Sequence, residues 1–280
     1  MVWEDEFASG PVDTDLSVLA RMICRGGWPA VLELPDDATA PIPASYIEAF
    51  VTNAEGKLSL SSAQLRGLLA SMARNVGSAV TQGTLAKDVY QAEKVSASER
   101  QQIARGLEFI ERHYVATPLH GWDAPIKSPH RLRTKPKWVF ADPSLPVALL
   151  GVGPERLMEN MQLFGQLFEE MCLRDLAVCA HALPNAGLDP LRYYRDSDGL
   201  EVDAVIELND GRWGAIEVKL GANKAADGER NLLRLAKKVA ANPSARNPEP
   251  SFLAVLTGKT DLKYRTESGV FVFPLTCLAP

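Results

Sequence analysis

The stretch EVDAVIELNDGRWGAIEVK, residues 201–219, decides how the C-terminal half of the chain folds. Two apolar runs flank Asn209-Asp210-Gly211, residue types that favour tight turns, so the stretch predicts a β-hairpin. The first run carries Asp203, and the second carries Glu217 and Lys219 two positions apart. Because side chains alternate along a strand, Glu217 and Lys219 lie on the same face of the second strand.

The length of the hairpin loop decides whether the two acids meet. A two-residue turn would place Asp203 opposite Val218, pointing away from Glu217. A three-residue loop, residues 209–211, with Gly211 in the left-handed conformation, places Asp203 directly across from Glu217. A site that uses both acids therefore requires the three-residue loop.

An acid on one strand and an acid and a lysine on the next are groups that a metal-dependent phosphodiesterase needs. Asp203 and Glu217 would hold Mg²⁺ or Mn²⁺ with part of its water shell, and Lys219 would orient the nucleophile or offset phosphate charge. The alternative is an exposed hairpin whose charges are only solvated. Both interpretations stay open at this point.

Length and composition are those of a soluble globular protein. The 280 residues suffice for one large domain or two ordinary ones, and no segment approaches the roughly 18 apolar residues of a membrane span. The first residues, MVWEDEF, are acidic and lead into no apolar run, so we expect no secretory signal and a cytoplasmic location. The cysteines form no C-x-x-C pair and the histidines form no ligand-spaced cluster, so we expect no structural zinc.

The charge of the chain is unevenly distributed. A formal net charge of -5 argues against attraction to nucleic acid over the whole chain. The segment IKSPHRLRTKPKW, residues 126–138, nevertheless contains only basic charged residues. We expect this basic patch to contact DNA phosphates through Lys127, Arg131, Arg133, Lys135 and Lys137.

Three helical segments precede the basic patch. The first covers about residues 61–75, the second is short, and the third begins at Ser96, where Glu99 completes a capping-box signature. An extended stretch, 114–119, and a strand, 137–141, follow, which is the order of a winged helix-turn-helix. The basic patch would then form the wing, and the third helix would offer to DNA the side chains of Arg100, Arg105 and Arg112. The alternative is a three-helix spacer or docking surface.

From residue 136 the pattern predicts a central mixed sheet flanked by helices. The expected elements are a strand at 138–141, a helix over about 160–178, a strand at 191–195, the hairpin, a helix over about 223–242, and strands at 252–256 and 270–273. The triplet Gly258-Lys259-Thr260 is similar to the end of a P-loop, but Leu253 stands where that loop needs a glycine. We therefore predict a loop between two strands there, and no nucleotide site.

The helix expected over 160–178 carries two adjacent acids. We expect Glu170 at the surface, paired with Arg174 one turn later, and Glu169 nearer the core, where it could look into the site. The alternative for Glu169 is an ordinary half-exposed helix acid.

Several runs resemble the C-terminal domain of a large prokaryotic family of AAA-type ATPases. They are KPKWVFADPSL, GQLFEEMCLRDL, YYRDSDGLEVDAVIEL and AIEVKLG. That domain is of unknown function and is similar to the PD-(D/E)XK restriction-endonuclease-like fold. The run RGGWPAVL resembles the segment that follows the ATPase core in this family, and the helices from Ser61 to His113 resemble its winged-helix insert.

The resemblance implies a domain organisation and a fold. A helical lead-in would cover 1–58, a winged-helix-like domain 59–135, and a PD-(D/E)XK nuclease-like domain 136–280. The fold class would be α/β, with an N-terminal helical and winged-helix region followed by a restriction-endonuclease-like mixed β-sheet flanked by helices. The chain has no P-loop ATPase core, so we expect no ATP hydrolysis and either a stand-alone form or a piece of a longer ATPase.

By position, the resemblance also implies roles for four residues. Asp203 and Glu217 resemble the metal-binding acids, Lys219 the lysine of the nuclease motif, and Glu169 the acid on the first helix of such folds. The implied function is DNA binding with Mg²⁺- or Mn²⁺-dependent cleavage, that is, a deoxyribonuclease. The alternative is a catalytically inactive DNA-binding, regulatory or protein-interaction module, with an ATPase or a second copy of the chain as partner.

Overall fold

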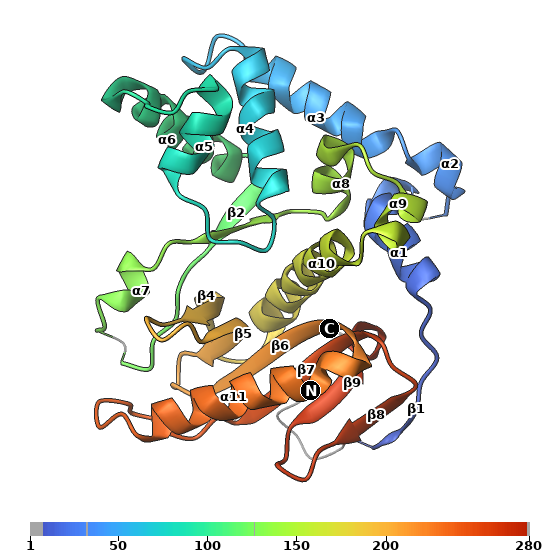
Figure 1. The fold of residues 1–280 in the computed structure, drawn as a ribbon, viewed down its shortest axis with the longest axis vertical. Coiled ribbons are helices and arrows are strands. Elements are labelled where there is room, and N and C mark those ends of the chain that lie inside the picture. Colours follow the sequence, from blue (N-terminus) through green and yellow to red (C-terminus); the bar gives the residue numbers. More distant parts are fainter. Residues whose placement is uncertain (1–7, 32, 126, 279–280) are drawn as a thin grey trace. The chain divides into compact units, whose positions relative to one another are not determined.

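The computed structural model describes residues 8–31, 33–125 and 127–278, and it divides into two compact units (Figure 1). The sheet unit takes its described residues from 1–16, 119–134 and 172–280, and the helical unit takes its own from 17–118 and 135–171. This division differs from the expected boundaries at residues 58 and 135. The reason is that the chain passes between the units several times, so each unit is assembled from separate segments.

A seven-stranded mixed sheet forms the sheet unit, in the order β1-β8-β9-β7-β6-β5-β4. Its strands are β1 Gly10–Pro11, β4 Ala186–Arg195, β5 Glu201–Leu208, β6 Trp213–Gly221, β7 Phe252–Lys259, β8 Leu262–Arg265 and β9 Phe271–Pro274. β7 runs parallel to β6 and to β9, and the other pairs are antiparallel. The expected mixed α/β class is confirmed.

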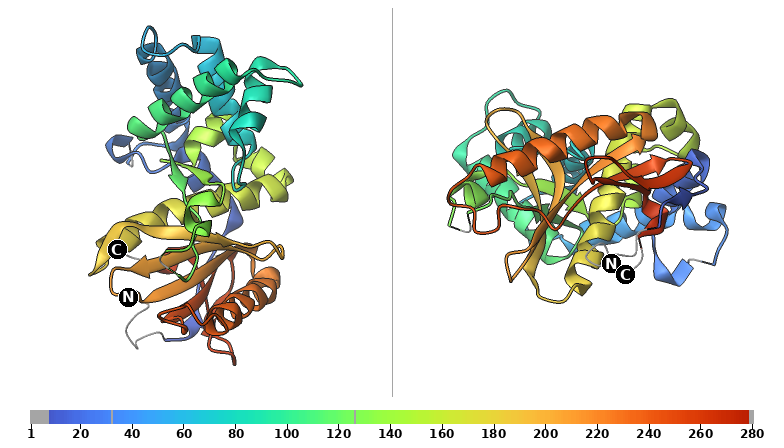
Figure 2. Two further views of the ribbon diagram at one scale, coloured as in Figure 1. Left: turned by 90° about the vertical axis from the view of Figure 1, so that its left-hand side faces the viewer. Right: turned by 90° about the horizontal axis from the view of Figure 1, so that it is seen from below.

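Helices cover both faces of this sheet, as Figures 1 and 2 show. α11, Ala225–Ala240, connects the parallel strands β6 and β7, and its residues Leu232 and Leu235 pack with Trp213 in one hydrophobic cluster. Burying a leucine completely stabilises the fold by about 1.5–3 kcal/mol, so the apolar stripe of α11 fixes this helix on the sheet. The second half of α10, Met161–Ala182, lies on the other face.

The helical unit contains most of the remaining helices. Their bounds are α1 Leu16–Arg25, α2 Asp36–Thr39, α3 Ile42–Asn53, α4 Ser62–Arg74, α5 Gln82–Tyr90, α6 Ala97–Arg112, α8 Ser144–Leu150 and α9 Pro154–Glu159, with the short 3-10 turn η1 Pro29–Val31. The predicted capping box is confirmed: Ser96 and Glu99 cap each other's backbone at the start of α6. Leu68 of α4 and Ile103 of α6 are fully buried in the shared core. No helix in the described part of the chain is long and apolar enough to cross a membrane.

The segment 119–134, called the strap below, packs into the sheet unit. It connects β2, Ala116–Leu119, to β3, Lys137–Phe140, and contains the short helix α7, His130–Arg133. Within it Gly121 pairs with Tyr193 of β4, and the indole of Trp122 lies in the core beside α11. Of the basic residues expected to form a wing, Arg131 lies against the sheet, whereas Lys127 and Lys135 are exposed.

The C-terminal strands differ from the prediction in one detail. β7 extends to Lys259, so Gly258 and Lys259 belong to a strand instead of a loop, and β8 follows where no strand was predicted. The Lys259 ammonium donates a hydrogen bond to the backbone oxygen of Thr14 at 2.7 Å, and the hydroxyl of Thr14 bonds the backbone of Thr260. These residues tie the N-terminal segment to the sheet. Two 3-10 turns, η2 Ala222–Lys224 and η3 Leu275–Cys277, complete the unit.

Candidate functional site

The β5–β6 hairpin has the loop that a two-acid site requires. The ladder register and the closing backbone hydrogen bonds leave residues 209–211 as a three-residue loop. Gly211 has φ of 85°, a left-handed conformation that glycine adopts without strain. The predicted loop is confirmed, and its register places Asp203 opposite Glu217 on the face that α11 covers.

Asp203, Glu217, Lys219 and Asn231 form a connected group, called the acid–lysine cluster below. The Lys219 ammonium lies 3.6 Å from the Asp203 carboxylate and donates a hydrogen bond to Glu217. Asn231 of α11 donates to the other oxygen of Glu217 at 3.0 Å, and the backbone N–H of Val218 donates to Asp203 at 2.8 Å. Two strands and a helix therefore hold both carboxylates around one cation.

The cluster is largely shielded from water. The side chains of Asp203, Glu217 and Lys219 are 13%, 2% and 20% exposed. Burial raises the pKa of Glu217, and the nearby charge of Asp203 raises it further, because both effects penalise the ionised carboxyl. Two ionised carboxylates would exceed the charge of Lys219 by one, and a cation bound beside them would favour the ionised form of Glu217.

Asp203 and Glu217 fit a magnesium or manganese ion by the kind of donor they offer. Mg²⁺ prefers carboxylate oxygens, commonly binds one or two of them, and keeps several waters. In the described ranges no group of three or more histidine, cysteine, aspartate or glutamate side chains could hold a metal ion. An ion at this cluster would therefore be held by these two carboxylates together with water.

Asn231 is the member of the cluster that sequence reasoning missed. It lies on α11 opposite the strands, and Gly228, one turn earlier, allows the helix to approach closely. A Cβ atom at Gly228 would stand only 3.1 Å from the Cβ of Glu217. A glycine and an asparagine three positions apart on the apolar face of a helix are the only sequence signal that could have indicated this contact.

Glu169 belongs to the helical unit, and its carboxylate forms an ion pair with the ammonium of Lys137 at 3.0 Å. Its neighbour Glu170 is fully buried and accepts a hydrogen bond from the backbone N–H of Phe140. Burial raises the pKa of Glu170 to about 8. The expected surface position of Glu170 is wrong, because α10 is covered by β3 on that side and not only along its apolar face.

The residues expected to contact nucleic acid fall into different environments. Arg100 and Arg105 are exposed on α6, Lys127 is exposed within the strap, and Lys135 is exposed just after it. Arg112 pairs with Glu108 on the same helix at 2.6 Å. Lys137 is 1% exposed, which does not fit the expected phosphate contact. The side chain of Arg133 lies outside the described residues.

Arg131 instead bonds to side chains of the sheet unit. Its guanidinium makes two hydrogen bonds, at 2.6 and 2.9 Å, to the carboxylate of Glu207 on β5. It also lies over the ring of Trp122, 5.9 Å from the ring centroid. These contacts explain why the strap is ordered against the sheet, and they remove Arg131 from the exposed basic patch.

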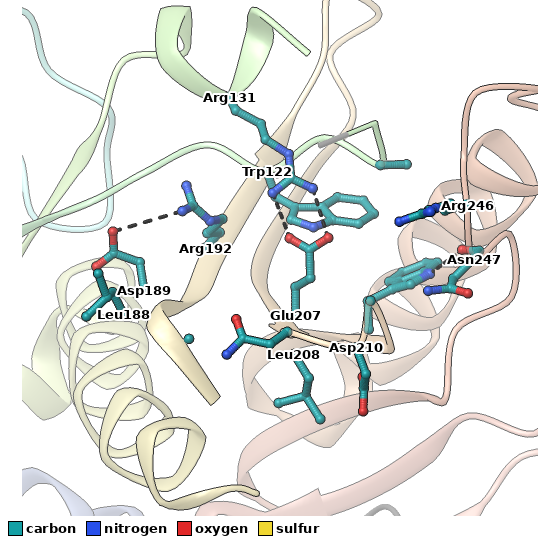
Figure 3. A pocket seen from close by; sticks show the side chains of 15 residues that line it. Trp122, Arg131, Leu188, Asp189, Arg192, Glu207, Leu208, Asp210, Arg246 and Asn247 are labelled. Atoms are coloured by element: carbon teal, nitrogen blue, oxygen red, sulfur yellow. Dashed lines mark hydrogen bonds and ion pairs between the residues drawn. The ribbon is translucent and has the colours of Figure 1, made fainter. Parts of the chain in front are cut away.

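A cavity of about 540 Å³ opens beside this ion pair (Figure 3). It lies at the loop end of the β5–β6 hairpin and is called the tryptophan–arginine pocket below. Trp122 and Trp213, with ring centroids 5.0 Å apart, line it together with Arg192 and Arg246. The sequence pattern did not indicate this pocket, because its walls come from four segments that are far apart in the chain.

Two family models match the chain. A domain of unknown function (DUF8612) matches residues 17–156, which is half of the chain, and a second domain of unknown function (DUF4143) matches residues 164–278. The chain belongs to the DUF8612 family. In this member of the DUF8612 family, the DUF4143 match runs from α10 through η3 and contains the whole acid–lysine cluster.

The DUF4143 match agrees in part with the resemblance drawn from the sequence. DUF4143 is a domain typically found in AAA-ATPase-associated proteins. The comparisons with curated proteins and with solved structures gave no match. Only the DUF4143 match connects this chain with ATPase-associated proteins, and the chemistry has to be argued from the residues.

Proposed function

We propose that this protein binds nucleic acid and hydrolyses its phosphodiester bonds with Mg²⁺ or Mn²⁺ held at the acid–lysine cluster. The observation that carries the proposal is the convergence of Asp203 and Glu217 on the ammonium of Lys219. Isolated charges on an exposed hairpin would have no reason to be buried together, since burying a charge costs free energy unless it is compensated.

Each residue of the cluster has a role in this proposal. Asp203 and Glu217 would hold the metal, which supplies Lewis-acid activation of a water when bound. Lys219 would offset the phosphate charge or orient the attacking water. Asn231, which bonds one oxygen of Glu217, would be a positioning residue that fixes the carboxylate plane.

The helical unit would contribute to nucleic-acid binding. α4, α5 and α6 followed by the β2–β3 pair have the element order of a winged helix, and α6 presents Arg100 and Arg105 to solvent. A nuclease-like sheet and a winged-helix-like unit are the finer fold assignments that this proposal adopts. The exposed arginines predict binding that weakens steeply as salt concentration rises.

A cleavage assay tests this function directly. The purified full chain would be incubated with supercoiled, linear duplex and single-stranded DNA in Mg²⁺, in Mn²⁺ and in chelator. We expect metal-dependent cleavage of at least one DNA form, and Lys219→Ala should reduce its rate by about two orders of magnitude or more. Lys237→Ala, an exposed lysine of α11, is the matched control and should cleave like the wild type. Absence of cleavage in every metal and every DNA form would refute the proposal.

A second candidate function has an observation of its own in its favour. Every carboxylate of the cluster already has protein donors, and the Glu217 side chain is 2% exposed, as a structural ion cluster would be. The protein would then be a non-catalytic DNA-binding or regulatory module beside an ATPase or a second copy of itself. Salt-sensitive DNA binding that survives Asp203→Ala, without cleavage, would identify this case.

A further inference from the structure

The tryptophan–arginine pocket is built by backbone contacts, so it exists without a ligand. The register of β4 and β5 shifts between Ala186 and Leu191, which leaves a bulge in β4 that carries Leu188, 95% exposed, to the rim. The strap is fixed to β4 by two backbone hydrogen bonds: the N–H of Trp122 donates to Tyr193 at 2.7 Å, and the N–H of Tyr193 donates to His120 at 3.1 Å. A bulge beside a cavity is a common way to redirect side chains toward a site.

The opposite wall is fixed as well. The indole N–H of Trp213 donates to the backbone oxygen of Asn247 at 2.9 Å, which holds the segment after α11 against the hairpin. Figure 3 shows Arg246 and Asn247 on one side of the pocket, Arg192 and Asp189 on the other, and the Arg131–Glu207 pair between them. The cavity is therefore a preformed site with polar groups on two sides.

Of the residues that the structure describes, three arginines and three acids line the pocket, and one of these acids, Asp210, is paired with Arg212 from outside the lining, which leaves Arg246 without an acid of its own. Glu207 is paired with Arg131, Asp189 lies 3.9 Å from the guanidinium of Arg192, and Asp210 is paired with Arg212 at 2.8 Å. Among the described residues, Arg246 has neither a hydrogen bond nor an ion pair, and it is exposed at the rim. An exposed guanidinium that its surroundings do not neutralise favours an anionic group, above all a phosphate.

The floor of the pocket favours a planar ring. Arg131 donates two hydrogen bonds to Glu207, which hold its guanidinium in a fixed plane over the ring of Trp122. Nucleobases stack on aromatic rings and on guanidinium planes, and amide and carboxylate side chains such as Asn247 bond their edges. A purely apolar ligand would leave these polar groups without water or partners.

An extended peptide fits the pocket less well. Peptides commonly bind by adding a strand to an exposed sheet edge. The edge strand here is β4, and at Tyr193 its backbone already bonds to the strap, with the N–H of Tyr193 donating to His120 at 3.1 Å. The edge next to the cavity is therefore closed to strand addition.

We propose that the tryptophan–arginine pocket binds one nucleotide unit, with its phosphate on Arg246 and its base against the Arg131 plane. The inference rests on the proposed nucleic-acid function. Trp213, which lines the pocket, lies on the same face of β6 as Glu217, four residues away. At about 3.3 Å per residue this is roughly 13 Å, so a strand held in the pocket could reach the acid–lysine cluster. The nucleotide could come from a free nucleoside monophosphate or from an unstacked position of a single strand.

Calorimetric titration of the 280-residue chain carrying Glu217→Gln tests the pocket without cleavage. The probes are the four deoxynucleoside monophosphates, the four nucleosides, inorganic phosphate and a short single-stranded oligonucleotide. We expect at least one monophosphate or the oligonucleotide to bind, and Arg246→Ala to weaken this binding about tenfold to a hundredfold. Arg246→Lys should recover part of the loss. Arg234→Ala, an exposed arginine of α11 outside the pocket, is the matched control and should change nothing.

The outcomes separate this inference from the proposed function. Binding of the monophosphate alone identifies a free nucleotide as ligand, and binding of the oligonucleotide alone identifies a single strand. The inference is overturned if neither binds, if nucleosides or phosphate bind as tightly as the monophosphate, or if Arg246→Ala has no effect. A protein that cleaves DNA but fails this test loses only the pocket assignment, and one that passes it without cleaving loses only the catalytic proposal.

Discussion

The acid–lysine cluster and the tryptophan–arginine pocket lie on the same β-hairpin, yet they use charge in opposite ways. In the cluster, Asp203, Glu217 and Lys219 are mostly buried and bond one another. In the pocket, the acids are paired and Arg246 remains exposed without a partner in the described structure. Changes in the cluster should therefore affect folding strongly, whereas changes at the rim of the pocket should affect binding alone.

The largest effect on stability is expected for Lys219→Met. Removal of one partner from a buried ion cluster leaves uncompensated charge, which costs about 3–5 kcal/mol. Urea denaturation near neutral pH would measure the loss in the free energy of unfolding. Lys237→Met, at an exposed position of α11, should stay within about 0.5 kcal/mol of the wild type. A loss below about 1 kcal/mol for Lys219→Met would mean that the cluster is not a coupled unit.

Glu170 provides a reference for a buried carboxyl outside the cluster. Its pKa rises from the ordinary value of 4.5 to about 8 in the folded protein. The folded state therefore binds more protons than the unfolded state between these values, so its contribution to stability falls as pH rises through this window. The effect should be on the order of a few kcal/mol, and it should disappear in Glu170→Gln. Unfolding free energies from about pH 5 to 9 would measure it; an unchanged slope in the variant would contradict the assignment.

An intermediate effect is expected for Arg131→Met. Its ion pair with Glu207 is 12% and 17% exposed, so water can partly solvate the carboxylate that remains. We expect a loss of about 1–3 kcal/mol, because hydrogen bonds to charged groups contribute about that much. Urea denaturation of Arg131→Met and Lys219→Met under the same conditions would compare their losses in the free energy of unfolding. A larger loss for Arg131→Met than for Lys219→Met would reverse the comparison.

The smallest effect on stability is expected for Arg246→Ala. The side chain is exposed and contacts no described partner, so the free energy of unfolding should change by less than about 0.5 kcal/mol. Thermal unfolding in the presence and absence of a deoxynucleoside monophosphate would check both halves of the expectation. The wild type should be stabilised by the nucleotide and the variant should not. A destabilised variant would show that Arg246 has a structural role.

The hairpin shows how far sequence could predict this site. The alternation of apolar residues and the Asn-Asp-Gly turn fix the strands, and the positions of Asp203 and Glu217 fix the loop length if they are to meet. Asn231 and the pocket could not be predicted in this way, since they depend on how α11 and the strap pack on the sheet. Periodicity within one segment carries no information on such long-range contacts.

The strap and α10 contain residues that the sequence pattern assigned to the surface and that the structure largely buries. Lys127 and Lys135 are exposed, as the basic residues of 126–138 indicated, but Trp122 just before them packs in the core and Arg131 pairs with Glu207. On α10 the helical period correctly placed Phe164 and Leu167 inside, but it assigned Glu170 to the surface because it assumes one buried face. A helix covered on two sides buries polar positions that a single-face pattern places in water.

The most direct test of the central claim is a Mn²⁺ titration followed by electron paramagnetic resonance. The full chain would be compared with Asp203→Asn and Glu217→Gln, which keep the shape of each side chain and remove its charge. A metal site at the acid–lysine cluster predicts that the wild type binds Mn²⁺ and that each variant binds it at least tenfold more weakly. No binding by the wild type, or binding by the two variants as tight as that of the wild type, would contradict it.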